Sequence, residues 1–205
     1  MSREASVAEL IAASDPAAAR NALGGVTVQT PTIACDDLAE IAGGPVVLKA
    51  ECLQRTGSFK LRGALNKVAA LGERASGGLV TASAGNHGRA VAYAARAVGV
   101  PCDVFMPRDA PVSKVAAVEQ LGARVDLVGA SVEEALELAG KRVERGGPAL
   151  VHPFDDLDVI TGQGTVALEL LEAVPDLARV VVPVGGGGLR AGWGSRCARR
   201  VCVPS

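Results

Sequence analysis

Lys60 is the residue of this 205-residue chain whose position best suits covalent chemistry. It follows Gly57 and Ser58, and the apolar spacing after it predicts a helix to about Leu71. Gly57 permits a tight turn, and Ser58 is a favourable N-cap. The positive end of the helix dipole disfavours an ammonium in the first turn, and a lysine needs a neutral amine to attack a carbonyl and form a Schiff base. A solvated surface lysine is the competing interpretation.

Two further segments carry groups that bind anions. Residues 83–88, Ser-Ala-Gly-Asn-His-Gly, follow a predicted strand and open a predicted helix, so their backbone N–H groups converge where a substrate carboxylate would fit. A capped turn with a partly buried His87 has the same composition. The four glycines 185–188 also follow a predicted strand, and glycines let the backbone approach a phosphate closely. The run matches neither a P-loop nor a dinucleotide fingerprint, and no helix is predicted after it.

Strands and helices must position these segments, and they alternate along most of the chain. Apolar runs without alternation indicate parallel strands covered on both faces, so the expected fold class is α/β. The predicted helices span 4–13, 16–22, 33–42, 60–71, 88–98, 112–121, 131–145 and 160–173. The predicted strands span 45–50, 79–82, 102–106, 124–128, 148–151 and 179–184.

Composition excludes several classes of function. The net charge is −1 and aromatic residues make up 2%, which argues against a nucleic-acid partner. No apolar run reaches about 18 residues, so no membrane span is expected. The five cysteines form no CxxC pair, which predicts reduced thiols in a cytoplasmic protein. No spacing of histidines and acids predicts a metal site.

Together, these segments resemble the pyridoxal-phosphate enzymes of the tryptophan-synthase-β fold (fold type II), and within them the serine/threonine dehydratases. The resemblance covers roughly residues 30–189. It rests on five segments in matching order and spacing, which are 49–60 with 62–64, 83–88, 152–156, 162–165 and 182–189.

The resemblance implies a role for each candidate residue. Lys60 would hold pyridoxal 5'-phosphate, Phe59 would lie against the cofactor ring, and Asn86 would bond the ring hydroxyl. Backbone N–H groups of Gly185, Gly186, Gly187, Gly188 and Leu189 would bind the phosphate. The substrate carboxylate would be held by Ser83, Gly85, Asn86 and His87.

The implied reaction converts L-threonine or L-serine to 2-oxobutanoate or pyruvate, with release of ammonia. Cysteine synthases of this fold carry a threonine where this chain has His87. Serine racemases carry a second serine where this chain has Ala84, and a methyl group cannot move a proton. Dehydration is therefore favoured over racemisation. A serine racemase-like enzyme, an inactive remnant and a cofactor-binding protein with another role stay open as alternatives.

The resemblance also implies two domains and a partner class. Residues 50–151 would form the smaller domain, and 1–49 with 152–189 would be parts of a larger, incomplete cofactor-binding domain. Residues 190–205 carry four arginines and no acid, show no helical or strand period, and have the composition of a frameshifted tail. The expected partner is a small amino acid, full-length relatives are expected to be homo-oligomers, and the expected setting is amino-acid metabolism such as isoleucine biosynthesis.

Overall fold

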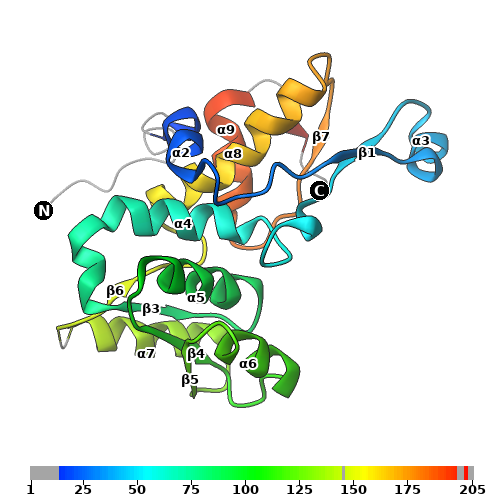
Figure 1. The fold of residues 1–205 in the computed structure, drawn as a ribbon. Coiled ribbons are helices and arrows are strands. Elements are labelled where there is room, and N and C mark those ends of the chain that lie inside the picture. The colour runs from blue at the N-terminus through cyan, green and yellow to red at the C-terminus, as the bar shows by residue number, and fades with distance from the viewer. Residues whose placement is uncertain (1–13, 145, 198–200, 203–205) are drawn as a thin grey trace, which may run out of the picture.

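A computed structural model describes residues 14–144, 146–197 and 201–202. The helix predicted over 4–13 lies outside these residues. Within them, helices cover a parallel sheet, as the alternation of the sequence predicts (Figure 1). No helix in this described part is long and apolar enough to cross a membrane.

The central sheet has four parallel strands in the order β5-β4-β3-β6. These strands are β3 (Leu79–Ala82), β4 (Cys102–Met106), β5 (Arg124–Leu127) and β6 (Ala149–Leu150). The helices that connect them are α5 (Asn86–Val98), α6 (Val112–Glu119) and α7 (Val132–Glu144). The first two crossovers run in one direction and the third runs back past β3 to β6. Because crossovers are right-handed, this reversal puts α7 on the opposite face of the sheet from α5 and α6.

Successive residues of the inner strands are buried on opposite faces. Leu79 joins a core beneath α4 and α5, whereas the next residue, Val80, packs against α7. In β4, Val104 is likewise buried in the first core and Phe105 in the second. Side chains alternate across a strand, so burial on both faces requires an uninterrupted apolar run. This is the physical reason why the sequence pattern identified these strands correctly.

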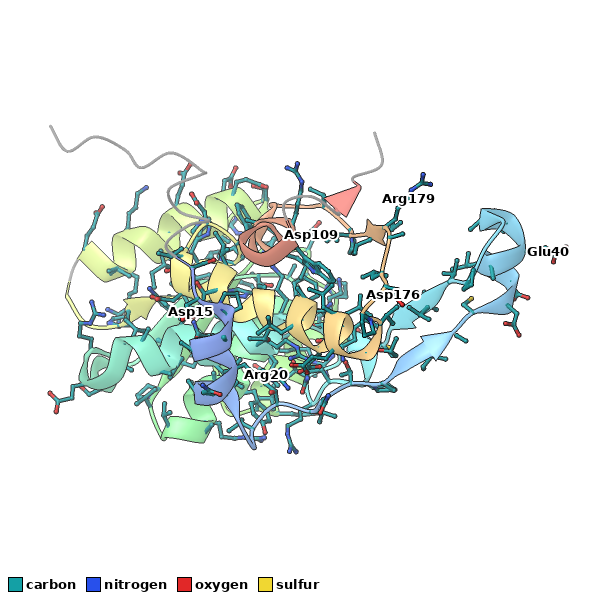
Figure 2. The ribbon with its side chains drawn as sticks, turned by 90° about the horizontal axis from the view of Figure 1, so that it is seen from above. Asp15, Arg20, Glu40, Asp109, Asp176 and Arg179 are labelled. Carbon is teal, nitrogen blue, oxygen red and sulfur yellow. The ribbon has the colours of Figure 1, made fainter. Side chains whose placement is uncertain are left out.

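A second layer of helices lies beside the sheet. Helix α8 (Leu157–Ala173) is its centre and packs against α4 (Lys60–Leu71), α2 (Pro16–Leu23) and α9 (Gly188–Cys197). Asp15 accepts from two backbone N–H groups at the start of α2, and Figure 2 shows it at that end. Two short strands, β7 (Val180–Val181) and β8 (Val201–Cys202), pair in parallel nearby. The 3-10 turns η1 (Glu51–Leu53) and η2 (Gly72–Gly77) flank α4 in the chain.

An arm projects from this body. It consists of β1 (Thr32–Ala34), α3 (Asp36–Ala42) and β2 (Val47–Lys49), with β1 and β2 antiparallel (Figure 1). Figure 2 shows Glu40 of α3 at its far end. The side chains of Ile41 and Leu48 on this arm are exposed.

Two sequence-based predictions about helix starts were wrong. The helix predicted over 33–42 begins only at Asp36, because Ile33 pairs with Leu48 in a sheet that the local pattern did not reveal. Ser58 does not cap α4: the N-cap position falls on Phe59, and the Ser58 hydroxyl has no partner. The start of α7 shows only half of a capping box. Ser131 accepts from the N–H of Glu134, but the Glu134 carboxylate accepts from Ala130.

The segment after the glycine run was expected to lack regular structure, and this was also wrong. Helix α9 continues from the glycines, and Trp193 is buried in a core with Val166 and Val182. The backbone of α9 contacts α8 directly at Gly192. This contact needs no stripe of apolar side chains, so the sequence shows no helical pattern there. Close backbone packing thus replaces the usual amphipathic face.

Candidate active site

Lys60 is the first residue of α4, and it therefore lies in the first helical turn, as the sequence predicted. Its Nζ donates to the carbonyl oxygen of Pro153 at 2.6 Å. Burial lowers the pKa of the amine, because desolvation disfavours the charged form. Gly57 takes the predicted tight turn before it, with φ of +76°. Lys60 is therefore a partly buried amine, and its neutral, nucleophilic form is more populated than that of an exposed lysine.

The second candidate segment lies at the end of β3. Helix α5 begins at Asn86, whose side chain is exposed, and the N–H of Gly85 donates to the Ser83 hydroxyl at 3.1 Å. His87 is buried, and its Nε2 lies 3.0 Å from the carbonyl oxygen of Val151. Because a carbonyl only accepts, Nε2 carries the proton in this contact.

The tautomer of His87 limits what its ring can bind. Burial lowers the pKa of His87 to about 3, so the ring is neutral near pH 7. With the proton on Nε2, the buried Nδ1 is an acceptor, and it has no partner. The ring can therefore accept a hydrogen bond but cannot donate one to a carboxylate. Any carboxylate held at His87 would be bound by its backbone N–H.

The glycine run ends where α9 begins, at Gly188. Gly187 has φ of +83°, a conformation that favours glycine. A Cβ atom on Gly186 would lie 2.2 Å from Cγ of Phe154, so only glycine fits against that ring. Gly188 also lies close to Phe154, because a Cβ atom there would be 3.0 Å from the Phe154 carbonyl oxygen. Free N–H groups at the start of a helix beside a glycine turn form an anion-binding geometry.

Segment 151–154 joins the three candidate segments. His87 binds the carbonyl of Val151, Lys60 binds the carbonyl of Pro153, and Gly186 packs on the ring of Phe154. His152 holds this segment in a turn, because its Nδ1 accepts from the N–H of Asp155 at 2.8 Å and its ring contacts Phe154 edge-on. In the sequence, 152–156 is one of the five segments that carry the resemblance, but no role was predicted for it.

The topology of the sheet explains this convergence. Residues 83–88 leave the carboxyl end of β3, and 151–154 leave the carboxyl end of its neighbour β6. Because β3 and β6 are parallel neighbours, their carboxyl ends lie at the same edge of the sheet. Ligands of open α/β sheets bind outside the carboxyl ends of the strands. The candidate residues that are distant in sequence therefore meet at one edge of the sheet.

Phe59 and Leu189, two further candidates, have apolar contacts. Both are partly buried and pack against the core that contains Trp193. The Phe59 ring centroid lies 5.4 Å from the Lys60 amine. The two residues therefore tie the turn before α4 and the start of α9 to the same core.

A buried ion network that the sequence did not reveal supports the start of α4. Arg62 is 1% exposed and binds both oxygens of Glu51 and both of Glu169, at 2.6 to 2.9 Å. Lys49 also binds Glu169, at 2.6 Å. Burial opposes the charge on Arg62, but hydrogen bonds to the two carboxylates outweigh it and raise the pKa of Arg62. The network therefore links the residues on either side of the loop that precedes Lys60.

Two other features lie outside this site. A cavity of about 450 Å³ between α2 and α8 is bordered by Arg20, Thr27 and Gln29 and by none of the candidate residues. Among the described residues, no three His, Cys, Asp or Glu side chains gather where they could hold a metal ion.

Comparison with known proteins identifies the class to which this fold and site belong. The chain belongs to the family described as pyridoxal-phosphate dependent enzyme, which it matches over residues 25–201. The match passes Leu189, where the sequence-based resemblance ended, and it includes α9. The fold is that of the tryptophan-synthase-β-like enzymes, fold type II.

Particular relatives include an L-threonine ammonia-lyase and serine racemases. The L-threonine ammonia-lyase of Thermotoga maritima is 48% identical over 184 residues, covering 89% of this chain and 46% of that protein. A serine racemase of Oryza sativa subsp. indica is 43% identical over 165 residues, 80% of this chain and 49% of its own length. The structure of maize serine racemase matches with a TM-score of 0.86 and 36% identity, over 92% of this chain and 59% of that one. The chain thus spans about half the length of these curated relatives.

Proposed function

We propose that this chain carries the cofactor lysine and phosphate loop of a pyridoxal-phosphate-dependent ammonia-lyase that acts on L-threonine or L-serine. The products would be 2-oxobutanoate or pyruvate, together with ammonia. The observation that carries the proposal is the convergence of Lys60, His87 and Gly186 on segment 151–154. The identity to L-threonine ammonia-lyases supports the choice of reaction.

The residues present fit the cofactor. Lys60 offers an amine of lowered pKa for the aldehyde. The loop 185–188 and the N–H of Leu189, at the start of α9, offer donors for the phosphate. Phe59 would face the ring and Asn86 its hydroxyl. The buried, unpartnered Ser58 hydroxyl and His87 Nδ1 are polar atoms that a bound polar group would satisfy.

The chemistry divides between cofactor and chain. The bound cofactor would supply a ring that accepts the electrons of the substrate α-carbon. Ser83, the N–H groups of Gly85 and His87, and Asn86 would hold the substrate carboxylate. Lys60 must leave the Pro153 carbonyl before its amine can take the α-proton. Its lowered pKa favours this step, because a neutral amine can accept a proton and an ammonium cannot.

Racemisation is the second candidate, since serine racemases are also close relatives. Ala84 favours elimination, because its methyl group can neither give nor take a proton on the face opposite Lys60. A non-catalytic cofactor-binding protein would bind pyridoxal phosphate at Lys60 without turnover. The domain division at 50–151, homo-oligomeric assembly and a cytoplasmic location belong to the same proposal.

Reduction with borohydride in the presence of pyridoxal phosphate tests the proposal. Peptide mass analysis should place the pyridoxyl adduct on Lys60, and Lys60→Arg should abolish it. An adduct on Lys49 or Lys67 would refute the assignment. A second experiment tests the reaction. From L-threonine or L-serine, the 2-oxo acid should form faster than the D-amino acid, and chiral analysis measures the D-amino acid. Faster racemisation would favour the second candidate, and binding without either product would favour the non-catalytic one.

A further inference from the structure

Residues 162–165, Gly-Gln-Gly-Thr, form a buried stretch of α8 for which the proposed function has no role. Gly162 and Gly164 are two residues apart, so they face nearly opposite sides of the helix. Each is the point where the backbone of a neighbouring helix touches α8.

The crossing with α4 is a backbone contact. A Cβ atom on Gly162 would lie 2.5 Å from the Arg62 carbonyl oxygen and 2.7 Å from Cα of Gly63. A Cβ atom on Gly63 would in turn lie 2.7 Å from the Val159 carbonyl oxygen. These neighbours are main-chain atoms that cannot rotate away, so a methyl group at either glycine must push the two helices apart.

The crossing with α9 is built in the same way. A Cβ atom on Gly164 would lie 2.7 Å from the Gly192 carbonyl oxygen. A Cβ atom on Gly192 would lie 2.5 Å from the Ile160 carbonyl oxygen and 2.7 Å from the Gly164 nitrogen. Helix α8 is thus in close backbone contact with α4 on one side and with α9 on the other.

Each crossing lies about one turn from a functional helix start. Gly63 is three residues after Lys60, and Gly192 is four residues after Gly188. We propose that Gly162, Gly164 and Gly192 are positioning residues that set the separation between the Lys60 amine and the phosphate loop 185–188. The inference rests on the proposed function, since a cofactor held at both its aldehyde and its phosphate end requires a fixed span between the two.

Gly192→Ala tests the inference, with Gly140→Ala as the control. Gly140 lies inside α7, and a Cβ atom there would meet nothing within 4 Å. Gly192→Ala should weaken binding of pyridoxal phosphate at least about tenfold, because it displaces the loop. Binding of pyridoxal, which has the aldehyde but no phosphate, should stay within about twofold of the wild type. Equal losses for both compounds, or no loss for either, would overturn the inference.

Amide hydrogen exchange separates a failure of this inference from a failure of the proposed function. If the wild-type chain takes up no pyridoxal phosphate, the proposed function is wrong. The positioning role is then decided on the free protein. Gly192→Ala should speed exchange in 185–189 and leave α5 unchanged, and an unaltered rate in 185–189 would overturn it.

A second variant covers the case in which Gly192→Ala does not fold. Gly164→Ala changes the same crossing on its α8 side. The new Cβ atom would also lie 2.7 Å from Cγ of Pro16 in α2. The variant is therefore made together with Pro16→Ala and compared with Pro16→Ala alone. Loss of pyridoxal phosphate binding, or faster exchange in 185–189, in the double variant alone would support the inference. The same behaviour in both proteins would contradict it.

Discussion

Lys60 and Lys67 lie on the same helix, but their pKa values are shifted in opposite directions. Burial without an acidic partner lowers the pKa of Lys60. Burial also opposes the charge on Lys67, but hydrogen bonds to Asp156 and Asp158 outweigh it and raise the pKa of that amine. The difference matters for function, because only a neutral amine attacks an aldehyde.

Acylation of the free protein across a pH series should therefore separate these two lysines. The labelling midpoint of Lys60, followed by peptide mass analysis, should fall below the ordinary value of 10.5. That of Lys67 should fall above 10.5. Asp156→Asn removes one partner of Lys67 and should lower only the Lys67 midpoint. A Lys60 midpoint at or above that of Lys67 would contradict the assignment of Lys60 as the reactive amine.

His87 makes the stability of the chain depend on pH. Its pKa is about 3 in the folded protein against 6.5 for an ordinary histidine. Between these values the unfolded chain binds the proton and the folded chain does not, so stability falls as pH drops below 6.5. His87→Gln should reduce this acid sensitivity in urea unfolding. Nuclear magnetic resonance should show no ring protonation of His87 between pH 8 and 5, and a titration in that range would refute the buried neutral ring.

At the scale of elements, Arg62 joins η1, α4 and α8 through two buried carboxylates. A contrasting ion pair, between Arg20 and Glu172, joins α2 to α8 at the surface. Removing one partner of a buried pair leaves uncompensated charge in the interior, whereas an exposed pair is screened by water. The two arginines therefore allow a matched comparison of how buried and exposed ion pairs hold helices to α8.

Arg62→Leu should lower the free energy of unfolding by about 3–5 kcal/mol, because Glu51 and Glu169 lose their shared cation. Arg20→Leu should lower it by about 0–1 kcal/mol. Urea unfolding followed by circular dichroism measures both. If the two substitutions cost the same, the network would not be what fixes the start of α4.

At the scale of the whole molecule, several apolar side chains face solvent. Ile41 of the arm is 83% exposed and Val181 of β7 is 77% exposed. Exposed strand edges and apolar patches favour association with another surface. Relatives about twice as long contain further chain that could cover such residues, as the coverage of 46% of the Thermotoga maritima protein indicates.

We therefore expect weak cofactor binding and slow turnover from the 205-residue chain alone. Extension past residue 197 with the corresponding part of a relative should increase solubility, cooperativity of unfolding and 2-oxo acid formation. The measurement compares both proteins by sedimentation, thermal unfolding and product assay. A matched extension of scrambled sequence is the control. If the short chain already equals the extended one in turnover, the expectation is wrong.

The sequence alone determined the parallel strands, the position of Lys60 and the family. Residues such as 79–82 and 102–106 are buried on both faces, so their apolar runs are local signals that need no partner to be recognised. The position of Lys60 in the first turn of a helix was equally visible, because helix periodicity and a preceding glycine turn are encoded within a dozen residues. The motifs that carry the resemblance are also short and contiguous, and their order along the chain was sufficient to identify the family.

Only the tertiary structure decided how these segments meet. Segment 151–154 binds Lys60, His87 and Gly186 because β3 and β6 are neighbours, and strand order is not a local property of the sequence. The pairing of Ile33 with Leu48 and the burial of Arg62 likewise depend on distant residues. Helix α9 was missed because its stability comes from a glycine contact with α8 and from one buried tryptophan, and neither produces a periodic pattern. Contacts between residues 32 to 93 positions apart in the sequence therefore bring the candidate segments together, and local motifs do not encode such contacts.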